Sequence, residues 1–189
     1  MTLEAWLVLA VVATLLLLFV GMTFNSLVAL RNRLRESWSD VDTELKRRYD
    51  LIPNLVAAVK GYAAHERTVL ERVVELRGRC MTPSDSRAKQ GAQEGELTEA
   101  LKRLMVVAEN YPVLKADQSF LELQRELVNT EDRIQAARRF YNENVRDYRN
   151  MRETFPSNLV ACGFRFQSEE YFGAAAAERE APSVARGQE

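Results

Sequence analysis

Histidine and cysteine, which carry much of the metal and nucleophile chemistry of proteins, are scarce in this sequence. His65 is the only histidine, and Cys80 and Cys162 are the only cysteines. Two cysteines this far apart, with no C-x-x-C spacing, cannot form a disulfide framework or a zinc site on their own. A catalytic triad would depend on His65, which the stretch AAHER places on a helix surface. These shortages argue against metal-dependent and histidine-dependent catalysis and favour a reduced, cytosol-facing protein body.

Phosphate-binding loops and an excess of positive charge are also missing. The sequence contains neither G-x-x-x-x-G-K-[ST] nor G-x-G-x-x-G, so nothing signals a cradle for nucleotide phosphates. Lysine and arginine number 26 against 27 aspartate and glutamate residues, which gives no whole-chain argument for nucleic-acid binding. The basic runs Lys46–Arg48 and Arg138–Arg139 lie among acids and are interpreted as solvated helix faces. We therefore expect no enzymatic activity, cofactor, metal, nucleic-acid partner or small-molecule substrate.

One long apolar run is present near the start of the chain. Residues 5–22, AWLVLAVVATLLLLFVGM, carry no charge, and about 20 such residues cross the roughly 30 Å hydrocarbon core of a bilayer. A cleavable signal peptide would need a basic start and a small-residue cleavage site, and the sequence offers neither. The sequence predicts an extracytoplasmic N-terminus over residues 1–4 and a transmembrane helix over residues 5–23. Because RNRLR begins at Arg31 and only Glu4 precedes the span, the rest of the chain should lie in the cytoplasm.

Beyond the span, apolar residues recur every three or four positions, which is typical of amphipathic helices. No strand-like alternation of useful length is present. Each stripe is apolar on one side only, so the stripes must be buried against one another. The sequence therefore predicts an all-α protein, with one transmembrane helix followed by an antiparallel up-and-down four-helix bundle over residues 24–172. The four stripes run from Leu27 to Tyr49, Ile52 to Leu76, Leu97 to Tyr111 and Phe120 to Phe155.

Polar and proline-containing stretches mark the ends of these helices. MTPSDSRAKQGAQEGE holds almost no large apolar residues, so we expect a mobile loop over about residues 80–95. The Tyr-Pro pair at residues 111–112 should end the third helix, and Asp117 should accept hydrogen bonds from the first amides of the fourth. The Phe-Pro pair at residues 155–156 should end the fourth helix.

The C-terminal part carries one more helix start signal. Ser168 is followed by two glutamates, which are favourable in a first helical turn. We predict a short last helix that begins there and runs through YFGAAAAERE, with a disordered tail after Pro182. Residues 173–189 should therefore hold a short helix and a disordered tail.

A proline lies within the apolar pattern at RRYDLIPNLV. Inside a helix, proline removes a hydrogen bond and clashes with the preceding turn, but in a first turn it costs little. If Asp50 is an N-cap, Pro53 falls at the third helical position. We therefore predict a chain reversal near residues 49–50, which makes the first two helices an antiparallel pair. The alternative is a single kinked rod as far as about Arg77, because the apolar steps nearly keep phase across the proline.

Three segments of the sequence resemble the LemA family of bacterial membrane proteins. They are RNRLRESWSDVDTELKRRYDLIPNLVAAVKGYAAHE, ENYPVLKAD and FLELQRELVNTEDRIQAARRFYNENVRDYRNMRETFPSNLVA, and the similarity extends from about Asn25 to Tyr171. The resemblance implies an N-terminal membrane helix, a cytoplasmic four-helix bundle and no established catalytic activity. It ends at the C-terminus, where APSV is followed by ARGQE rather than by an aromatic residue.

The resemblance also implies which residues form the family motif and what the protein does. Related proteins include a magnetosome-associated branch, and family genes often neighbour those of membrane-bound zinc metalloproteases. The implied function is a membrane-anchored scaffold or adaptor in membrane organisation or membrane-protein quality control. The alternative is a signalling or stress-response component, although residues 1–4 are too short for an external sensor. The motif residues, structural or interacting, are Arg48, Tyr49, Asp50, Pro53, Asn54, Phe155, Pro156 and Asn158.

The apolar segment LVACGFRF, residues 159–166, has two alternative positions. In an up-and-down bundle the fourth helix returns to the membrane, where interfacial aromatic residues and a snorkelling arginine are favoured. Alternatively, the segment caps the bundle core against Leu27 and Leu30. The candidate interface residues are Leu159, Phe164, Arg165 and Phe166.

These expectations together describe a single-pass protein of the bacterial inner membrane. Its expected partners are the lipid bilayer, further copies of itself in homo-oligomers, and a membrane protease or another membrane protein. Anchoring in two dimensions favours such contacts because it raises the effective concentration of the partners.

Overall fold

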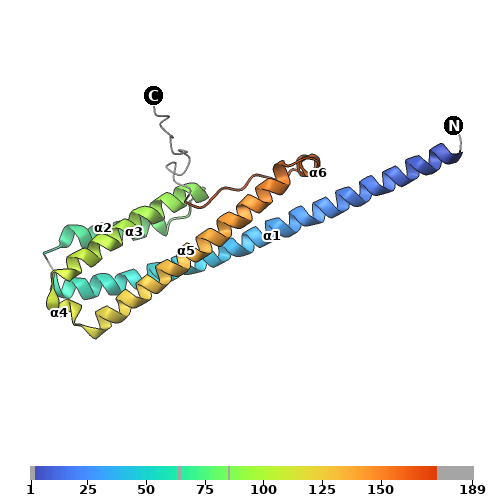
Figure 1. Ribbon diagram of the computed structural model, residues 1–189. Coiled ribbons are helices and arrows are strands. Elements are labelled where there is room, and N and C mark those ends of the chain that lie inside the picture. Colours follow the sequence, from blue (N-terminus) through green and yellow to red (C-terminus); the bar gives the residue numbers. More distant parts are fainter. Residues whose placement is uncertain (1–2, 64, 85, 174–189) are drawn as a thin grey trace, which may run out of the picture. The chain divides into compact units, whose positions relative to one another are not determined.

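The computed structural model describes residues 3–63, 65–84 and 86–173, and within these ranges every regular element is an α-helix (Figure 1). The predicted all-helical class and the long apolar N-terminal helix are thereby confirmed. The helices are α1 Leu3–Tyr62, α2 Arg67–Cys80, α3 Arg87–Glu109, α4 Pro112–Lys115, α5 Gln118–Glu153 and α6 Ser157–Gly163.

Helix α1 continues through the position where a chain reversal was predicted. It is 60 residues long and contains Pro53 in its interior, so the predicted turn at residues 49–50 is wrong and the single-helix alternative is right in this region. The chain reverses instead between Tyr62 and Arg67, the residues that end α1 and begin α2. The second predicted stripe is accordingly divided between α1 and α2.

A side chain from α2 compensates for the proline. Pro53 has no N–H, so the carbonyl of Tyr49, four residues earlier, lacks its helical donor. The Nε of Arg77 donates a hydrogen bond to that carbonyl oxygen at 2.7 Å. The interruption in α1 is therefore used to attach α2 to it.

This arrangement predicts a coupling between Pro53 and Arg77. Arg77→Met should destabilise the protein by about 1–3 kcal/mol, because it leaves a part-buried carbonyl without a donor. In a Pro53→Ala background the same change should cost much less, because the alanine N–H restores the helical hydrogen bond. Urea unfolding of all four proteins of the double-mutant cycle measures the coupling. Equal losses in both backgrounds would show that the carbonyl contact contributes nothing.

The described residues divide into two units, and both α1 and α5 contribute to each. The first unit contains residues 3–39 and 140–169, and the second contains residues 40–139 and 170–173. The buried apolar side chains of the first unit are Leu27, Leu34, Tyr141, Val145, Tyr148, Val160, Ala161 and Phe166. Those of the second unit include Val41, Leu45, Ile52, Leu55, Val59, Leu70, Val73, Leu76, Leu97, Leu101, Leu104, Phe120, Leu127, Ile134 and Phe172.

Two of the predicted helix ends are confirmed. The carboxylate of Asp117 accepts a hydrogen bond from the amide of Phe120 at 3.0 Å and so caps α5 as predicted. Helix α5 ends at Glu153, just before the Phe-Pro pair at residues 155–156. Helix α4 begins with Pro112 at its first turn, where a missing N–H costs little.

Two predictions for the polar segments are wrong. Residues 87–95, which were expected to lie in a mobile loop, form the first turns of α3. The predicted last helix does not begin at Ser168, because residues 168–173 are not helical. In both cases contacts between distant parts of the chain are present, from Glu170 to the start of α3 and from Arg138 to the carbonyls of residues 172 and 173. The remainder of the predicted C-terminal helix and tail lies outside the described residues.

Candidate functional site

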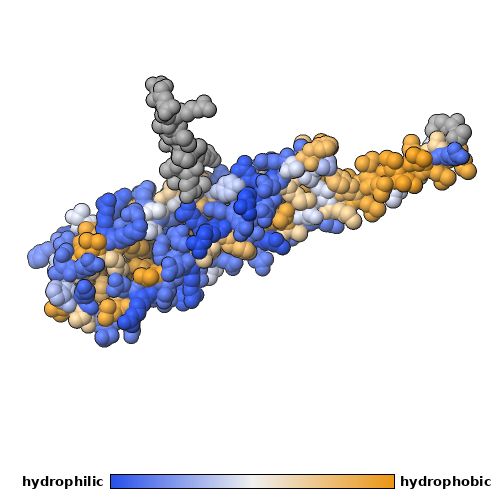
Figure 2. Space-filling view, in the orientation of Figure 1, coloured by the Kyte–Doolittle hydropathy of each residue, from blue (hydrophilic) through white to orange (hydrophobic). Residues whose placement is uncertain are grey.

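The apolar part of α1 is the first candidate site. Residues 3–19 are all exposed, and Figure 2 shows a hydrophobic surface along most of this part of α1. By length and composition, α1 is the one helix within the described ranges that could cross a membrane. An exposed apolar surface of this extent is unfavourable in water but suits a bilayer core.

A buried ionic cluster in the second unit is the second candidate. We call it the Arg48 cluster, and it contains Arg48, Tyr49, Glu94, Thr98 and Glu131 from α1, α3 and α5. Arg48 is 0% exposed, yet the neighbouring lysine and arginine of the same basic run are exposed. The prediction that the whole run is a solvated face is therefore wrong for Arg48, whose position on the helix turns it inward.

The guanidinium at the centre of the Arg48 cluster has several partners. Its Nη2 is ion-paired with Glu94, and its Nη1 lies 2.9 Å from both the Thr98 hydroxyl and a Glu131 carboxylate oxygen. The Thr98 hydroxyl donates to the other Glu131 oxygen at 3.2 Å. The Tyr49 hydroxyl donates to the second oxygen of Glu94. A charge this deeply buried is tolerated only with such compensation.

Burial governs the acid–base properties around the cluster. Desolvation raises the pKa of Glu94, against the opposing charge of Arg48. Desolvation likewise raises the pKa of the Tyr49 hydroxyl, with the Glu94 charge acting in the same direction. The buried thiol of Cys80 has its pKa raised to about 12 by burial and by Glu94. Neither the phenol nor the thiol is therefore ionised near neutral pH, and the arrangement connects helices rather than activating a nucleophile.

The two cysteines should differ strongly in reactivity. Cys80 is buried and Cys162 is exposed, and the thiolate is the reactive form. Maleimide treatment of the folded protein near neutral pH should therefore label one cysteine per chain, and treatment in denaturant should label two. Mass spectrometry of the intact chain and its peptides gives the count. Rapid native labelling of Cys80 would contradict the burial described here.

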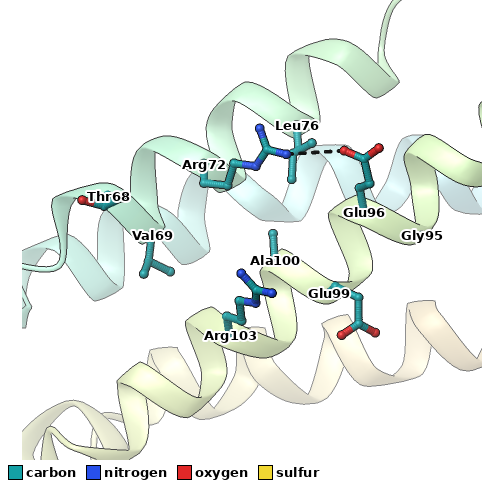
Figure 3. Close-up of a pocket in the computed structure, with 9 residues that line it drawn as sticks. All are labelled: Thr68, Val69, Arg72, Leu76, Gly95, Glu96, Glu99, Ala100 and Arg103. Carbon is teal, nitrogen blue, oxygen red and sulfur yellow. Dashed lines mark hydrogen bonds and ion pairs between the residues drawn. The ribbon is translucent and has the colours of Figure 1, made fainter.

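An open groove lies between α2 and α3 (Figure 3). Its volume is about 410 Å³, and Gly95 and Ala100 leave it room because their side chains are small or absent. Arg72 from α2 donates to Glu96 from α3 across the groove at 3.4 Å. The remaining residues that line this α2–α3 groove are Thr68, Val69, Leu76, Glu99 and Arg103. The groove thus offers an apolar floor and charges of both signs, without a cluster typical of a catalytic or metal site.

A short strap, residues 170–173, lies against α3 and α5 in the second unit. The Glu170 carboxylate accepts a hydrogen bond from the Ser86 hydroxyl at 2.6 Å, and negative charge at this helix start is favourable. The Phe172 side chain is buried. Arg138 donates to the carbonyl oxygens of Phe172 and Gly173. These carbonyl oxygens accept hydrogen bonds from the arginine and not from helical amides, which explains why no last helix begins at Ser168.

The strap also explains the glycine near the start of α3. A Cβ at Gly91 would overlap the backbone N and Cα of Gly173, and Gly173 itself has a φ of +64°. Glycine is needed at both positions, once for close approach and once for a left-handed backbone. The composition that suggested a mobile loop therefore allows a tight contact between segments 82 residues apart, as the Ala88–Glu170 hydrogen bond in the same region shows.

The residues of the predicted family motif differ in burial. Arg48 and Tyr49 enter the cluster, whereas the next motif residues point outward. Asn158 is part-buried, and its Oδ1 has no hydrogen-bond partner. The burial of Glu94 was not predicted, because a glutamate within a polar stretch gives no local sign that it will pair with an arginine 46 residues away. The exposed motif residues are Asp50, Pro53, Asn54, Phe155 and Pro156.

The candidate interface residues also divide into two groups. Leu159 and Phe164 are exposed, as is Arg165, whereas Phe166 is buried. The turn after α6 causes this difference. Arg165 has a φ of 55°, and the amide of Phe166 donates to the carbonyl of Ala161 at 2.9 Å, as in a Schellman motif with arginine in the usual glycine position. The chain therefore turns Phe166 inward, next to the ring of Phe24.

Metal ligation has no candidate in the part of the chain that the structure describes. No group of three or more histidine, cysteine, aspartate or glutamate side chains is placed there to hold an ion. The acidic residues of the Arg48 cluster are paired with the arginine instead.

These features define a class of protein, namely a membrane-associated helical protein in which the apolar segment and the folded units share one helix. A family model described as the LemA family matches residues 37–185. The chain therefore belongs to the LemA family, as the resemblance of its motifs indicated.

Two curated relatives support the same assignment. "Magnetosome protein MamQ 2" of Paramagnetospirillum magneticum is 27% identical, over 87% of this chain and 68% of the relative. "Protein LemA" of Metamycoplasma hominis is 24% identical, over 82% of this chain and 71% of the relative. Identities at this level connect the proteins as relatives and leave the role of each to be derived separately.

Proposed function

We propose that the protein is a membrane-anchored scaffold or adaptor that holds other membrane proteins, further copies of itself among them, at the inner membrane. The observation that carries the proposal is the continuity of α1, which runs from the apolar segment into the second unit without a loop. The same helix therefore supplies both the apolar segment and buried side chains of the second unit. Membrane organisation and membrane-protein quality control both require components of this kind.

The helical segments of the second unit give the proposed scaffold its form. We propose that residues 40–62 of α1, then α2, α3 and the first part of α5 make an antiparallel up-and-down four-helix bundle. The buried residues contributed by each segment support this arrangement. Such bundles pack their helices around a shared core and leave the outer faces for partners.

The α2–α3 groove is the proposed contact site for a partner helix that carries charges of both signs. A photo-reactive amino acid in place of Arg103, which lines the groove, should crosslink to membrane proteins or to a second copy in cells. The same amino acid in place of Asp132, an exposed residue of α5 outside the groove, is the matched control. Equal adducts from both positions, or none from either, would contradict a scaffold that acts through this groove.

Topology gives a direct test of the anchoring. We propose that the apolar segment crosses the inner membrane with the N-terminus outside, because the basic residues after it resist translocation. A reporter fused after Glu189 should be active only in its cytoplasmic form, and the protein should resist extraction from membranes at alkaline pH. Export of the reporter, or release of the protein into the alkaline supernatant, would contradict the arrangement.

A further inference from the structure

An exposed apolar patch in the first unit lies in and beside α6. It consists of Phe155, Leu159 and Phe164, which are 74%, 64% and 55% exposed. We call it the α6 patch, since α6 carries its central residue. Three large exposed apolar side chains within residues 155–164 favour a contact surface.

A ring contact fixes the position of the α6 patch relative to the apolar segment. The rings of Phe24 and Phe164 lie 4.8 Å apart between centroids, and those of Phe24 and Phe166 lie 5.7 Å apart. The uncharged apolar segment of α1 ends at Met22, and a helix of about 20 residues rises about 30 Å, the thickness of a hydrocarbon core. Phe24 follows that end by only about 3 Å of helix. Figure 2 accordingly shows apolar side chains of α6 beside the inner end of the hydrophobic rod.

The charges around the α6 patch also suit a bilayer surface. Arg165 is exposed beside it, and Arg33 and Arg35 are exposed on the following turns of α1. The guanidinium of Arg31 lies over the Phe166 ring at 5.3 Å from its centroid. Basic residues just beyond a membrane span are attracted to anionic headgroups, and aromatic residues are favoured at this depth.

We infer that the α6 patch rests in the interface of the same bilayer that α1 crosses and forms a second membrane contact. The inference depends on the proposed anchoring by α1 and adds a binding surface for lipid to it. One span alone allows a helix to tilt and rotate, whereas a second contact beside the span restricts both motions.

The test uses the full chain reconstituted into vesicles of phosphatidylethanolamine and phosphatidylglycerol. Cys162 lies within α6 and is exposed, so a nitroxide can be attached there while the buried Cys80 stays unlabelled. Collision rates with oxygen, which concentrates in lipid, and with a water-soluble nickel complex report the depth of the label. The matched control is a label on Arg146→Cys in a Cys162→Ser background, because Arg146 is exposed on α5 within the same unit.

The expected result is a ratio of oxygen to nickel collisions several-fold higher at Cys162 than at Arg146→Cys. Serine at both Phe155 and Leu159 should lower the ratio at Cys162 to the control value. Val113→Ser, which changes an equally exposed valine of α4, should leave it unchanged. Because these side chains are exposed, the substitutions leave the core intact.

A third label separates failure of this inference from failure of the anchoring. A nitroxide on Leu16→Cys, in the Cys162→Ser background, reports whether the apolar segment lies in lipid. If Leu16→Cys is in lipid and Cys162 is in water, the α6 patch does not rest in the bilayer and the inference is overturned. If both labels are in water, the proposed anchoring is overturned as well.

Discussion

Replacing Arg48 with methionine is expected to destabilise the protein by about 3–5 kcal/mol, because it leaves Glu94 as an uncompensated buried charge. Urea unfolding of the full chain in mild detergent, followed by circular dichroism, measures the loss. Arg47→Met is the matched control. It removes the adjacent arginine, whose exposed ion pair with Glu126 at 3.0 Å should contribute no more than about 1 kcal/mol.

The loss in the Arg48→Met protein should also depend on pH. Burial already raises the pKa of Glu94 in the folded state, and removal of the arginine raises it further. The folded protein then retains a proton that the unfolded chain releases above about pH 4.3, so stability falls as pH rises through this range. The loss should therefore be smaller near about pH 5 than near about pH 8.

A double variant distinguishes the loss of stability caused by the unpaired charge from the loss caused by poorer packing. Glu94→Met combined with Arg48→Met removes both charges, so it should be less destabilising than Arg48→Met alone. Equal losses in the Arg47→Met and Arg48→Met proteins, with no difference in pH dependence, would show that the cluster does not stabilise the second unit.

Replacing Phe172 with alanine is expected to cost about 3–5 kcal/mol, since it removes the buried ring of the strap itself. A substitution in α3, against which the strap lies, can also displace the strap. Gly91→Ala forces a Cβ into the backbone of Gly173 and should cost about 1–3 kcal/mol. Both losses are measured as changes in the free energy of unfolding.

Gly95→Ala is the control for the strap experiment. Gly95 lies one turn further along α3, and a Cβ there meets nothing within 4 Å. Alanine should therefore stabilise that helix by up to about 1 kcal/mol through its higher helix propensity. If Gly91→Ala also stabilises the protein, the strap does not lie against α3 as described.

The local sequence pattern was sufficient to predict most of the helices and several of the positions at which they end. The apolar segment of α1, the cap at Asp117 and the end of α5 each depend on neighbours within a few residues, and sequence spacing reveals such neighbours. The all-helical class and the family motif follow from the same short-range regularities. The membrane-interface position of residues 159–166 remains a prediction.

The wrong predictions share a different cause. Pro53 was placed at a turn because the donor that replaces its N–H belongs to Arg77, 28 residues beyond the carbonyl that accepts it. The start of α3 has a local cap at Ser86, but its side chain is also bound by Glu170, 84 residues further along the chain, and that contact gives no local sign in the sequence. Propensity and composition describe a segment alone, and tertiary contacts overrode them here.

The long separations within the second unit also set an order of assembly. Arg48 is synthesised 46 residues before Glu94 and 83 residues before Glu131. The apolar segment can therefore enter the bilayer while the arginine is still hydrated and the helices that will bury it do not yet exist. Domains generally fold as units once their chain is complete. The apolar face that α1 contributes to the second unit therefore stays uncovered until the strap, the last described part of that unit, has been synthesised.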